Sequence, residues 1–214
     1  MKHITFHLDF ISPYSHLAFE KMPEALMGLS YSVTYRPVLL GALLRHHGLL
    51  GPAEVSAKRD WTYRHVTWLA HQHEVTLEMP AVHPFNPLPL LRLAIACAGG
   101  EDPNRYVCET LLHHVWHGGA DAVAPARLQA LREQLAPPLE PDNEAVKLRL
   151  RQNTDVAIAA GIFGVPTYEV DGKLFWGFDS LPMLRRYLEG DAWFDGPAWQ
   201  QAAQVGQAVS SQRQ

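Results

Sequence analysis

Strand-like patterns occur only near the two ends of this chain, and that distribution limits the possible folds more than any other feature. Residues 3–11 alternate between apolar and polar side chains, and residues 31–38 are rich in β-branched and aromatic residues; both patterns are typical of strands. Residues 166–176 predict a hairpin, because Asp-Gly at 171–172 stands between alternating apolar runs. The segment 40–160 has little strand character. We therefore predict one mixed four-stranded sheet built from the two ends.

Helices are predicted around these strands. Residues 14–27 have a roughly helical spacing of apolar residues, with Ser12 as the expected N-cap, Pro13 in the first turn and Gly28 as a stop. The last helix is expected at residues 180–189. The central segment predicts helices at residues 54–74, 90–98, 104–117, 125–135 and 143–160, with a proline-rich loop at 80–89.

The predicted order is thus β-α-β, then a helical block, then β-β-α. This order is similar to the thioredoxin layout, an α/β fold, with an insertion in its middle. We predict a discontinuous thioredoxin-like domain from residues 1–39 and 161–214 and an inserted all-helical domain from residues 40–160. Near the C-terminus, three aromatic residues are expected to dock and the last residues to fray: Trp193, Phe194 and Trp199, then 210–214.

Composition narrows the class of protein. Of the 214 residues, 47% are apolar, which argues against a disordered chain. Lys and Arg number 18 and Asp and Glu 22, a net charge of −4, so neither nucleic acid nor a membrane surface is an expected partner. No apolar run approaches the ~18 residues of a membrane span. The first ten residues alternate as a strand does, unlike a signal peptide. We therefore expect a cytoplasmic protein.

Several residues that could bind a metal or a cofactor are expected to have structural roles. Cys97 and Cys108 form no Cys-x-x-Cys motif and are expected in the core. His113 and His117 are one helical turn apart, but a third ligand is not evident in the sequence, so we predict no metal site. A stripe on the predicted helix 54–74 is expected to face the core, with one wall of the pocket between the two lobes as the alternative: Trp61, His65, Trp68 and Leu69.

The segment Ser12-Pro13-Tyr14-Ser15 is the first candidate site. It lies at the start of a predicted helix, where unpaired N–H groups and about half a positive charge stabilise an anion such as a thiolate. A serine hydroxyl in this place can donate one further hydrogen bond. Ser12 is also suited to cap the helix, and this feature alone favours the capping role, since serine is a preferred N-cap residue.

Two further segments are candidates. In Gly164-Val165-Pro166-Thr167, a cis peptide bond before Pro166 would leave the N–H and C=O of Val165 free to pair with an extended peptide. The spacing alone favours a trans bond, because only ~5–6% of such bonds are cis. Farther along, Asp179 and Ser180 open the last helix, where N–H groups could hold a carboxylate and Asp179 an ammonium group. Both residues could also be helix caps only.

The three segments, in this order, resemble the 2-hydroxychromene-2-carboxylate isomerases and their relatives, the kappa-class glutathione transferases. The similarity extends to about residue 190 and is carried by Phe10-Ile-Ser-Pro-Tyr-Ser-His-Leu-Ala, Phe163-Gly-Val-Pro-Thr-Tyr and Phe175-Trp-Gly-Phe-Asp-Ser-Leu-Pro-Met-Leu. It implies the disulfide-oxidoreductase variant of the thioredoxin fold, with an inserted helical domain. Redox relatives carry cysteines where this chain has Ser12 and Ser15, so the site cannot perform thiol–disulfide exchange and the thiol has to come from outside.

The resemblance implies glutathione as the cofactor. Ser12 would be the catalytic residue, donating a hydrogen bond to the glutathione sulfur and favouring its thiolate. Val165, next to a cis Pro166, would pair with the cysteinyl backbone of glutathione. The γ-glutamyl end would be held by Asp179 together with the turn formed by Trp176, Gly177 and Phe178.

On the substrate side, the resemblance points to the loop that contains Phe85 and Asn86, where Asn86 would hydrogen-bond the substrate or steady the thiolate. An Asx turn before the following proline is the alternative interpretation. The segment with Gly51 and Pro52 resembles the family's substrate-side loop, which would approach the ligand. A carboxylate substrate also needs a cation, and the candidates are Arg45, Lys58 and Arg59.

These observations predict a glutathione-dependent cis/trans isomerase. The reaction implied by the resemblance converts a 2-hydroxychromene-2-carboxylate-like aromatic hemiketal into the trans-o-hydroxybenzylidenepyruvate form by reversible thiolate addition, in the catabolism of aromatic compounds. A kappa-like glutathione transferase or peroxidase is the first alternative. A redox-silent thioredoxin-like module that binds peptides is the second. The expected partners are glutathione and a small aromatic carboxylate, and the relatives imply a homodimer.

Overall fold

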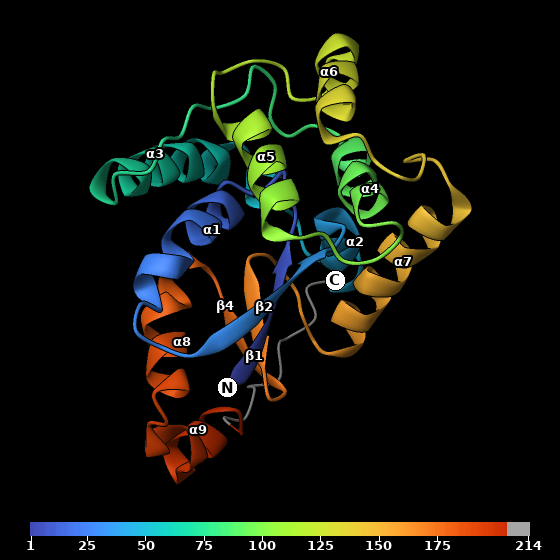
Figure 1. The fold of residues 1–214 in the computed structure, drawn as a ribbon. Coiled ribbons are helices and arrows are strands. Elements are labelled where there is room, and N and C mark those ends of the chain that lie inside the picture. Colours follow the sequence, from blue (N-terminus) through green and yellow to red (C-terminus); the bar gives the residue numbers. More distant parts are fainter. Residues whose placement is uncertain (205–214) are drawn as a thin grey trace, which may run out of the picture.

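The computed structural model describes residues 1–204 and contains one mixed four-stranded sheet with helices packed around it (Figure 1). The strand order is β2-β1-β3-β4. β1 (Lys2–Leu8) pairs in parallel with β2 (Tyr31–Pro37) and antiparallel with β3 (Thr167–Val170), which pairs antiparallel with β4 (Lys173–Trp176). The predicted sheet is thus confirmed. The predicted fraying at 210–214 lies outside the described residues.

The helices also follow the prediction closely, except that α2 and α9 were not predicted. Their bounds are α1 Pro13–Ala25, α2 Leu40–His46, α3 Ser56–Gln72, α4 Leu88–Cys97, α5 Arg105–Trp116, α6 Pro125–Leu135, α7 Glu144–Ala159, α8 Leu181–Leu188 and α9 Pro197–Ala202. Three short 3₁₀ helices are η1 Pro52–Glu54, η2 Phe178–Ser180 and η3 Ala192–Asp195. The sequence did not predict α2, because this helix buries only Leu43 and so shows no apolar period.

The central strand β1 differs from its prediction in one respect. The alternation placed Thr5 and His7 on a polar face opposite the apolar residues, yet Thr5 is 9% exposed and His7 is fully buried. Helices cover the sheet on both sides, with α1 and α8 together at one side and α7 at the other (Figure 1). His7 compensates for its burial through a 2.9 Å hydrogen bond between its Nε2 atom and Glu169 on β3. Alternation therefore identified the strand but not its surroundings.

The predicted Asp-Gly hairpin joins β3 to β4. Asp171 has φ 51° and Gly172 has φ 75°, the pair of positive angles that a two-residue type I′ turn requires. Behind this hairpin, Phe194 of η3 is 3% exposed and packs against Phe175 and Tyr187. The predicted docking is therefore confirmed for Phe194 and for Trp199, which packs against the same core, whereas Trp193 is 49% exposed.

The main hydrophobic core crosses the border between the two predicted domains. Phe6 of β1 belongs to the same buried cluster as Leu91 and Trp116 of the helical segment. A smaller cluster lies where the chain enters and leaves that segment, and it consists of Val38, Leu43, Ala157, Ile162 and Val165. The helical segment and the sheet therefore share a core, and the division at residues 39 and 161 stays a prediction. Among the described residues, no helix has the length and apolar character needed to cross a bilayer.

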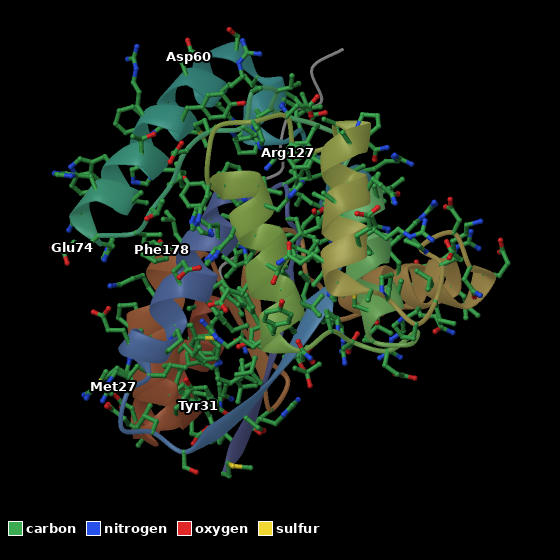
Figure 2. The ribbon with its side chains drawn as sticks, turned by 45° about the horizontal axis from the view of Figure 1, so that its top comes forward. Met27, Tyr31, Asp60, Glu74, Arg127 and Phe178 are labelled. Carbon is green, nitrogen blue, oxygen red and sulfur yellow. The ribbon has the colours of Figure 1, made fainter. Side chains whose placement is uncertain are left out.

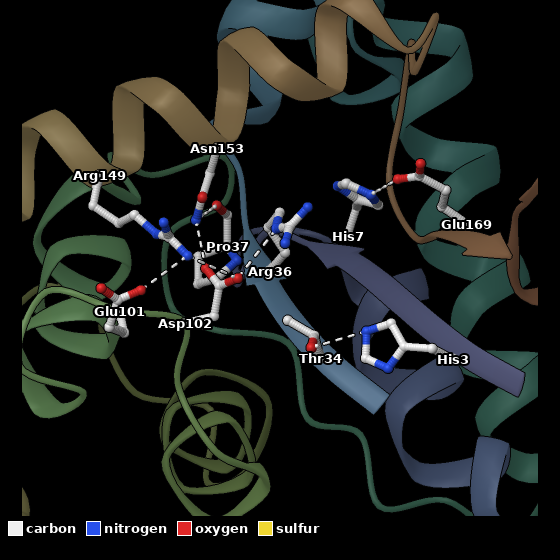
Figure 3. A network of polar contacts seen from close by, with 10 residues as sticks. All are labelled: His3, His7, Thr34, Arg36, Pro37, Glu101, Asp102, Arg149, Asn153 and Glu169. Carbon is white, nitrogen blue, oxygen red and sulfur yellow. Dashed lines mark hydrogen bonds and ion pairs between the residues drawn. The ribbon is translucent and has the colours of Figure 1, made fainter. Parts of the chain in front are cut away.

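A polar network centred on Asp102 fastens the sheet to the helical segment (Figure 3). The Asp102 carboxylate, 10% exposed, accepts hydrogen bonds from Arg36 of β2 at 3.1 Å and from Asn153 of α7 at 2.9 Å, and lies 3.2 Å from Arg149. Asn153 also donates to the carbonyl of Pro37 at 3.3 Å. One carboxylate is thus the common acceptor of three groups, of which Asn153 and Arg149 each have a second partner, Pro37 and Glu101.

We expect Asp102→Ala to lower the free energy of unfolding by about 3 kcal/mol, because two cations and an amide lose their common acceptor. Urea denaturation measures this change. Asp142→Ala is the matched control, since Asp142 pairs with Arg92 but is 82% exposed, and loss of an exposed pair costs at most about 1 kcal/mol. Equal losses in both variants would contradict a structural role for the Asp102 network.

Candidate active site

The loop between β1 and α1 places the Ser12 hydroxyl at the start of α1. Ser12 is 6% exposed, and its Oγ accepts a hydrogen bond from the N–H of Ser15 at 3.2 Å, so the residue caps the helix as predicted. The same Oγ lies 3.5 Å from the carbonyl of Val165, toward which it donates. Capping uses a lone pair of the oxygen, so the hydroxyl proton can still be donated, here over 3.5 Å toward Val165. The capping and donating roles of Ser12 are therefore compatible.

The second segment faces this hydroxyl. The peptide bond between Val165 and Pro166 is cis. Thr167 donates to the carbonyl of Gly164 at 2.8 Å, and the N–H of Gly177 donates to the carbonyl of Pro166 at 2.9 Å. The loop before β3 is therefore held from both sides, with Val165 next to Ser12.

The third segment follows β4 and brings a carboxylate to the same region. Gly177 has φ 98°, and a Cβ atom there would overlap the Asp179 carboxylate, so only glycine fits. Ser180 donates to the carbonyl of Gly177 at 2.8 Å, and Asp179 is exposed. Burial raises the pKa of the Tyr14 phenol, and the negative charge of Asp179 raises it further. η2, which contains Asp179, contacts α1, so this carboxylate lies near the helix that begins after Ser12.

Aromatic side chains border this group of segments. Trp176 is 55% exposed and its ring lies 4.8 Å from that of Phe163. A Cβ atom on Gly164 would come within 2.8 Å of the Trp176 indole nitrogen, so the ring lies against the Gly164 backbone. Phe178 is 8% exposed and meets His73 edge-on at 5.0 Å, just after the C-terminal end of α3, near Glu74 (Figure 2). The fold thus gathers all three predicted glutathione-side segments.

Three side chains of the helical segment hold the Ser12 loop, and the sequence pattern identified none of them. Trp116 donates to the carbonyl of Phe10 at 3.0 Å. His83 Nε2 bonds the carbonyl of Ile11 at 2.9 Å, and His65 Nδ1 lies 2.9 Å from the Tyr14 hydroxyl. No local signal marks these residues, because each acts on a group far away in the sequence.

The hydrogen bonds of His83 define its protonation. A carbonyl only accepts, so Nε2 carries the proton that bonds Ile11, and Nδ1 is the atom that lies 2.7 Å from the Tyr63 hydroxyl. Burial lowers the pKa of His83, which favours this neutral form. The ring therefore bridges α3 and the residue before Ser12 in one fixed tautomer.

Asp9 ties the Ser12 loop to the start of the helical segment. Its carboxylate is fully buried and accepts hydrogen bonds from the N–H of Ile11 at 3.2 Å and of Leu40 at 2.9 Å. Burial raises its pKa to about 7, although these backbone donors oppose the shift. A carboxyl group in this state is half protonated near neutral pH.

We expect Asp9 to lower the free energy of unfolding as the pH rises from 5 to 8. A carboxyl whose folded pKa is raised contributes stability that is complete below its unfolded pKa near 4 and is lost as the pH passes 7. The loss between pH 5 and 8 is about 3 kcal/mol by this linkage, because nearly two pH units lie between pH 5 and the folded pKa and each is worth about 1.4 kcal/mol. Urea denaturation of the protein and of Asp9→Asn at both pH values isolates this group. An equal pH dependence in the variant would exclude Asp9 as its source.

The predicted substrate-side residues are less closely grouped. Asn86 is exposed, and its Oδ1 accepts from the N–H of Leu88 at 3.1 Å, which is the contact expected of an Asx turn. Asn86 lines a hollow between α4 and α6, and within the described residues that lining includes none of Ser12, Val165 and Asp179. Phe85 is 9% exposed and lies 6.1 Å from the His83 ring.

The segment after α2 begins beside the cis-proline loop. His47 Nε2 bonds the carbonyl of Ile162 at 3.2 Å. The N–H of Gly51 donates to Glu54 at 2.6 Å, and Pro52 opens η1 with its side chain exposed. Arg45 is exposed on α2. Gly51 and Pro52 are therefore on a segment that is bonded to the site, whereas Arg45 makes no ion pair within the described part of the chain.

Two expectations about reactive or aromatic residues are answered by the structure. Cys108 is buried as predicted, Cys97 is half-buried, and burial raises the pKa of both thiols, so neither is poised as a thiolate. The expectation that the α3 stripe faces the core is wrong for Trp61 and Trp68, which are 67% and 55% exposed. Their rings stack on either side of His65, at 6.1 and 6.2 Å.

Comparisons with known proteins agree with this geometry. The chain is 29% identical over 194 residues to the 2-hydroxychromene-2-carboxylate isomerase of Sphingobium xenophagum, covering 87% of this chain and 98% of the relative. It is 27% identical to rat glutathione S-transferase kappa 1, covering 88% and 91%. A solved 2-hydroxychromene-2-carboxylate isomerase superposes with a TM-score of 0.73 at 20% identity, covering 96% of this chain and 100% of that one, which confirms the fold.

These relatives are isomerases and a glutathione transferase, which supports an enzyme of this general kind. The chain is similar to them over nearly its whole length. Residues 3–189 match the family model described as the DSBA-like thioredoxin domain, which covers most of the sequence. The predicted thioredoxin-like fold is therefore confirmed, and the chain belongs to the DSBA-like thioredoxin-domain family.

Proposed function

We propose that this protein is a glutathione-dependent cis/trans isomerase of 2-hydroxychromene-2-carboxylate-like aromatic substrates. One observation carries the proposal. The Ser12 hydroxyl, at a helix N-terminus, keeps a proton free to donate while its lone pair caps the helix, and it faces the loop of the cis Pro166. No cysteine stands beside it, so the site is suited to stabilise a thiolate brought by a ligand.

The donors and acceptors present fit glutathione. The Val165 backbone beside Pro166 would pair with the cysteinyl part, and the exposed Asp179 would pair with the γ-glutamyl ammonium group. Trp176, Gly177 and Phe178 shape the turn that carries Asp179. When bound, glutathione supplies the nucleophilic thiolate that adds reversibly to the substrate. Ser12 and the α1 N-terminus lower the thiol pKa, and the surrounding residues orient the ligand and exclude water.

The substrate would bind next to the residues predicted from the sequence and against an exposed aromatic surface of α3. Gly51 and Pro52 are favoured as substrate neighbours by the bond between His47 and Ile162. The roles of Phe85, Asn86 and Arg45 are proposed from the resemblance alone. The exposed rings of Trp61 and Trp68 would receive the aromatic ring, because His65 between them bonds Tyr14 of the candidate site. We also propose that the protein is cytoplasmic and forms a homodimer.

Calorimetric titration with glutathione, in two buffers of different protonation enthalpy, tests the proposal. Binding with proton release near neutral pH supports thiolate formation in the site. Binding without release contradicts the role of Ser12, and absence of binding leaves a peptide-binding module as the better account. Product analysis then distinguishes the reactions: an isomerase returns glutathione unchanged.

A kappa-like transferase or peroxidase is the second candidate, favoured by the similarity to rat glutathione S-transferase kappa 1. It would use the same Ser12 contact but would consume glutathione, as a conjugate or as a disulfide. Stoichiometric loss of glutathione during turnover decides for it.

A further inference from the structure

Histidine and glutamate side chains gather between α1 and α5, apart from the three segments of the candidate site. His16 and Glu20 are one helical turn apart on α1, and Glu109 and His113 are one turn apart on α5. These two helices contact each other. Ligand atoms of Glu20, Glu109 and His113 lie within 4.8 Å of one another, and His113 Nε2 is 2.8 Å from a Glu20 oxygen. The fold therefore pairs two groups that the sequence keeps far apart.

His16 provides a second, independent observation. Its side chain is fully buried, and its Nε2 bonds the carbonyl of Thr76 at 2.8 Å. Because a carbonyl only accepts, Nε2 carries the proton and Nδ1 presents a bare lone pair. Among the described residues Nδ1 has no hydrogen-bond partner, and it faces a Glu20 oxygen at 4.0 Å.

Two atoms with lone pairs, His16 Nδ1 and a carboxylate oxygen of Glu20, therefore face each other 4.0 Å apart. A metal-ligating histidine commonly donates its second N–H to a backbone carbonyl, as His16 does to Thr76.

We propose that α1 and α5 bind one divalent metal ion of the zinc class through the grouped Glu20, Glu109 and His113, with His16 Nδ1, which lies 4.0 Å from Glu20, as the fourth ligand. Two imidazole nitrogens and two carboxylates are a suitable donor set for tetrahedral Zn²⁺. The imidazoles disfavour Ca²⁺ and Mg²⁺, which prefer oxygen ligands only. The sequence predicted no metal site because no third ligand was evident beside His113 and His117. The proposed site uses His113 without His117, and Glu20 and His16 come from another helix.

This ion has a structural role, because it links two helices that both support the Ser12 loop. α1 begins at that loop, and α5 ends with Trp116, which bonds the Phe10 carbonyl. An ion that binds only the folded state stabilises it, so Zn²⁺ raises the melting temperature.

Metal titration of the full chain tests the site without any substrate or glutathione. Calorimetry with Zn²⁺ on chelator-treated protein is expected to show one tightly bound equivalent, and Co²⁺ to give the visible absorption of a tetrahedral site. Glu20→Gln and His113→Ala are each expected to weaken Zn²⁺ binding at least about tenfold and to abolish the rise in melting temperature. His46→Ala, which removes an exposed histidine on α2, is the control and leaves both unchanged.

Two outcomes would overturn the inference. Equal Zn²⁺ affinity in the wild type and in both α1–α5 variants would assign the ion to other histidines. Absence of the tetrahedral Co²⁺ absorption in the wild type would exclude the site whether or not the variants fold.

Discussion

We expect Ser12→Gly to lower glutathione-dependent turnover by roughly 10- to 100-fold while the fold stays intact. A hydrogen bond to a charged acceptor such as the glutathione thiolate contributes about 1.5–3 kcal/mol. The variant removes the hydroxyl that would donate this bond and that points toward the Val165 carbonyl in the structure. Glycine is the informative substitution, because it replaces a serine N-cap at a loss of only a few tenths of a kcal/mol. The lost turnover would then report the hydroxyl proton and not an unravelled helix.

The direct measurement is the pKa of the bound glutathione thiol, followed through the ultraviolet absorbance of the thiolate. We expect this pKa to rise by about one to two units in Ser12→Gly, the equivalent of the lost hydrogen bond. The α1 N-terminus remains, so some depression of the pKa persists.

Ser15→Ala is the matched control for this experiment. The Ser15 Oγ is buried, lies in the same turn, and has no hydrogen-bond partner among the described residues. Its removal is expected to leave turnover and the thiol pKa unchanged. If Ser12→Gly behaved in the same way as Ser15→Ala, Ser12 would be a cap and nothing more.

The sheet was predictable because its signals are local. The alternation of residues 3–11 and the Asp171-Gly172 turn each depend on a few neighbouring residues. The order of the elements along the chain then predicted the four-stranded sheet. What surrounds an element is not local. The buried His7 and the exposed Trp61 both contradict the simplest interpretation of their patterns, because burial depends on which helix comes to lie over them.

In the candidate site, too, some residues could be predicted from local motifs and others could not. The serine, the cis proline and the carboxylate that follow from the resemblance lie at ends of strands and helices, where short motifs are visible. His83, Trp116 and His65 hold that site through atoms of the Ser12 loop. A histidine in a proline-rich loop has no period or motif, so only the folded chain identifies its partner.

The second large effect is expected at His83, which we regard as a positioning residue. His83→Ala is expected to lower the free energy of unfolding by about 2–4 kcal/mol, since it removes a buried ring and leaves the Ile11 carbonyl without its donor. The Tyr63 hydroxyl keeps a partner, because it also lies 2.9 Å from the His83 backbone carbonyl. The loss therefore centres on Ile11, the residue before Ser12.

A merely structural role for His83 predicts a loss of stability alone, whereas positioning predicts a further change in the site. We expect His83→Ala to lower kcat at least about tenfold, with a smaller change in KM, because a displaced Ser12 stabilises the thiolate less well than it binds the ligand. His83→Gln is the decisive variant. Its amide N–H can donate to the Ile11 carbonyl as Nε2 does, so it is expected to recover most of kcat even if the smaller side chain leaves stability reduced. Recovery of stability without recovery of kcat would contradict the positioning role.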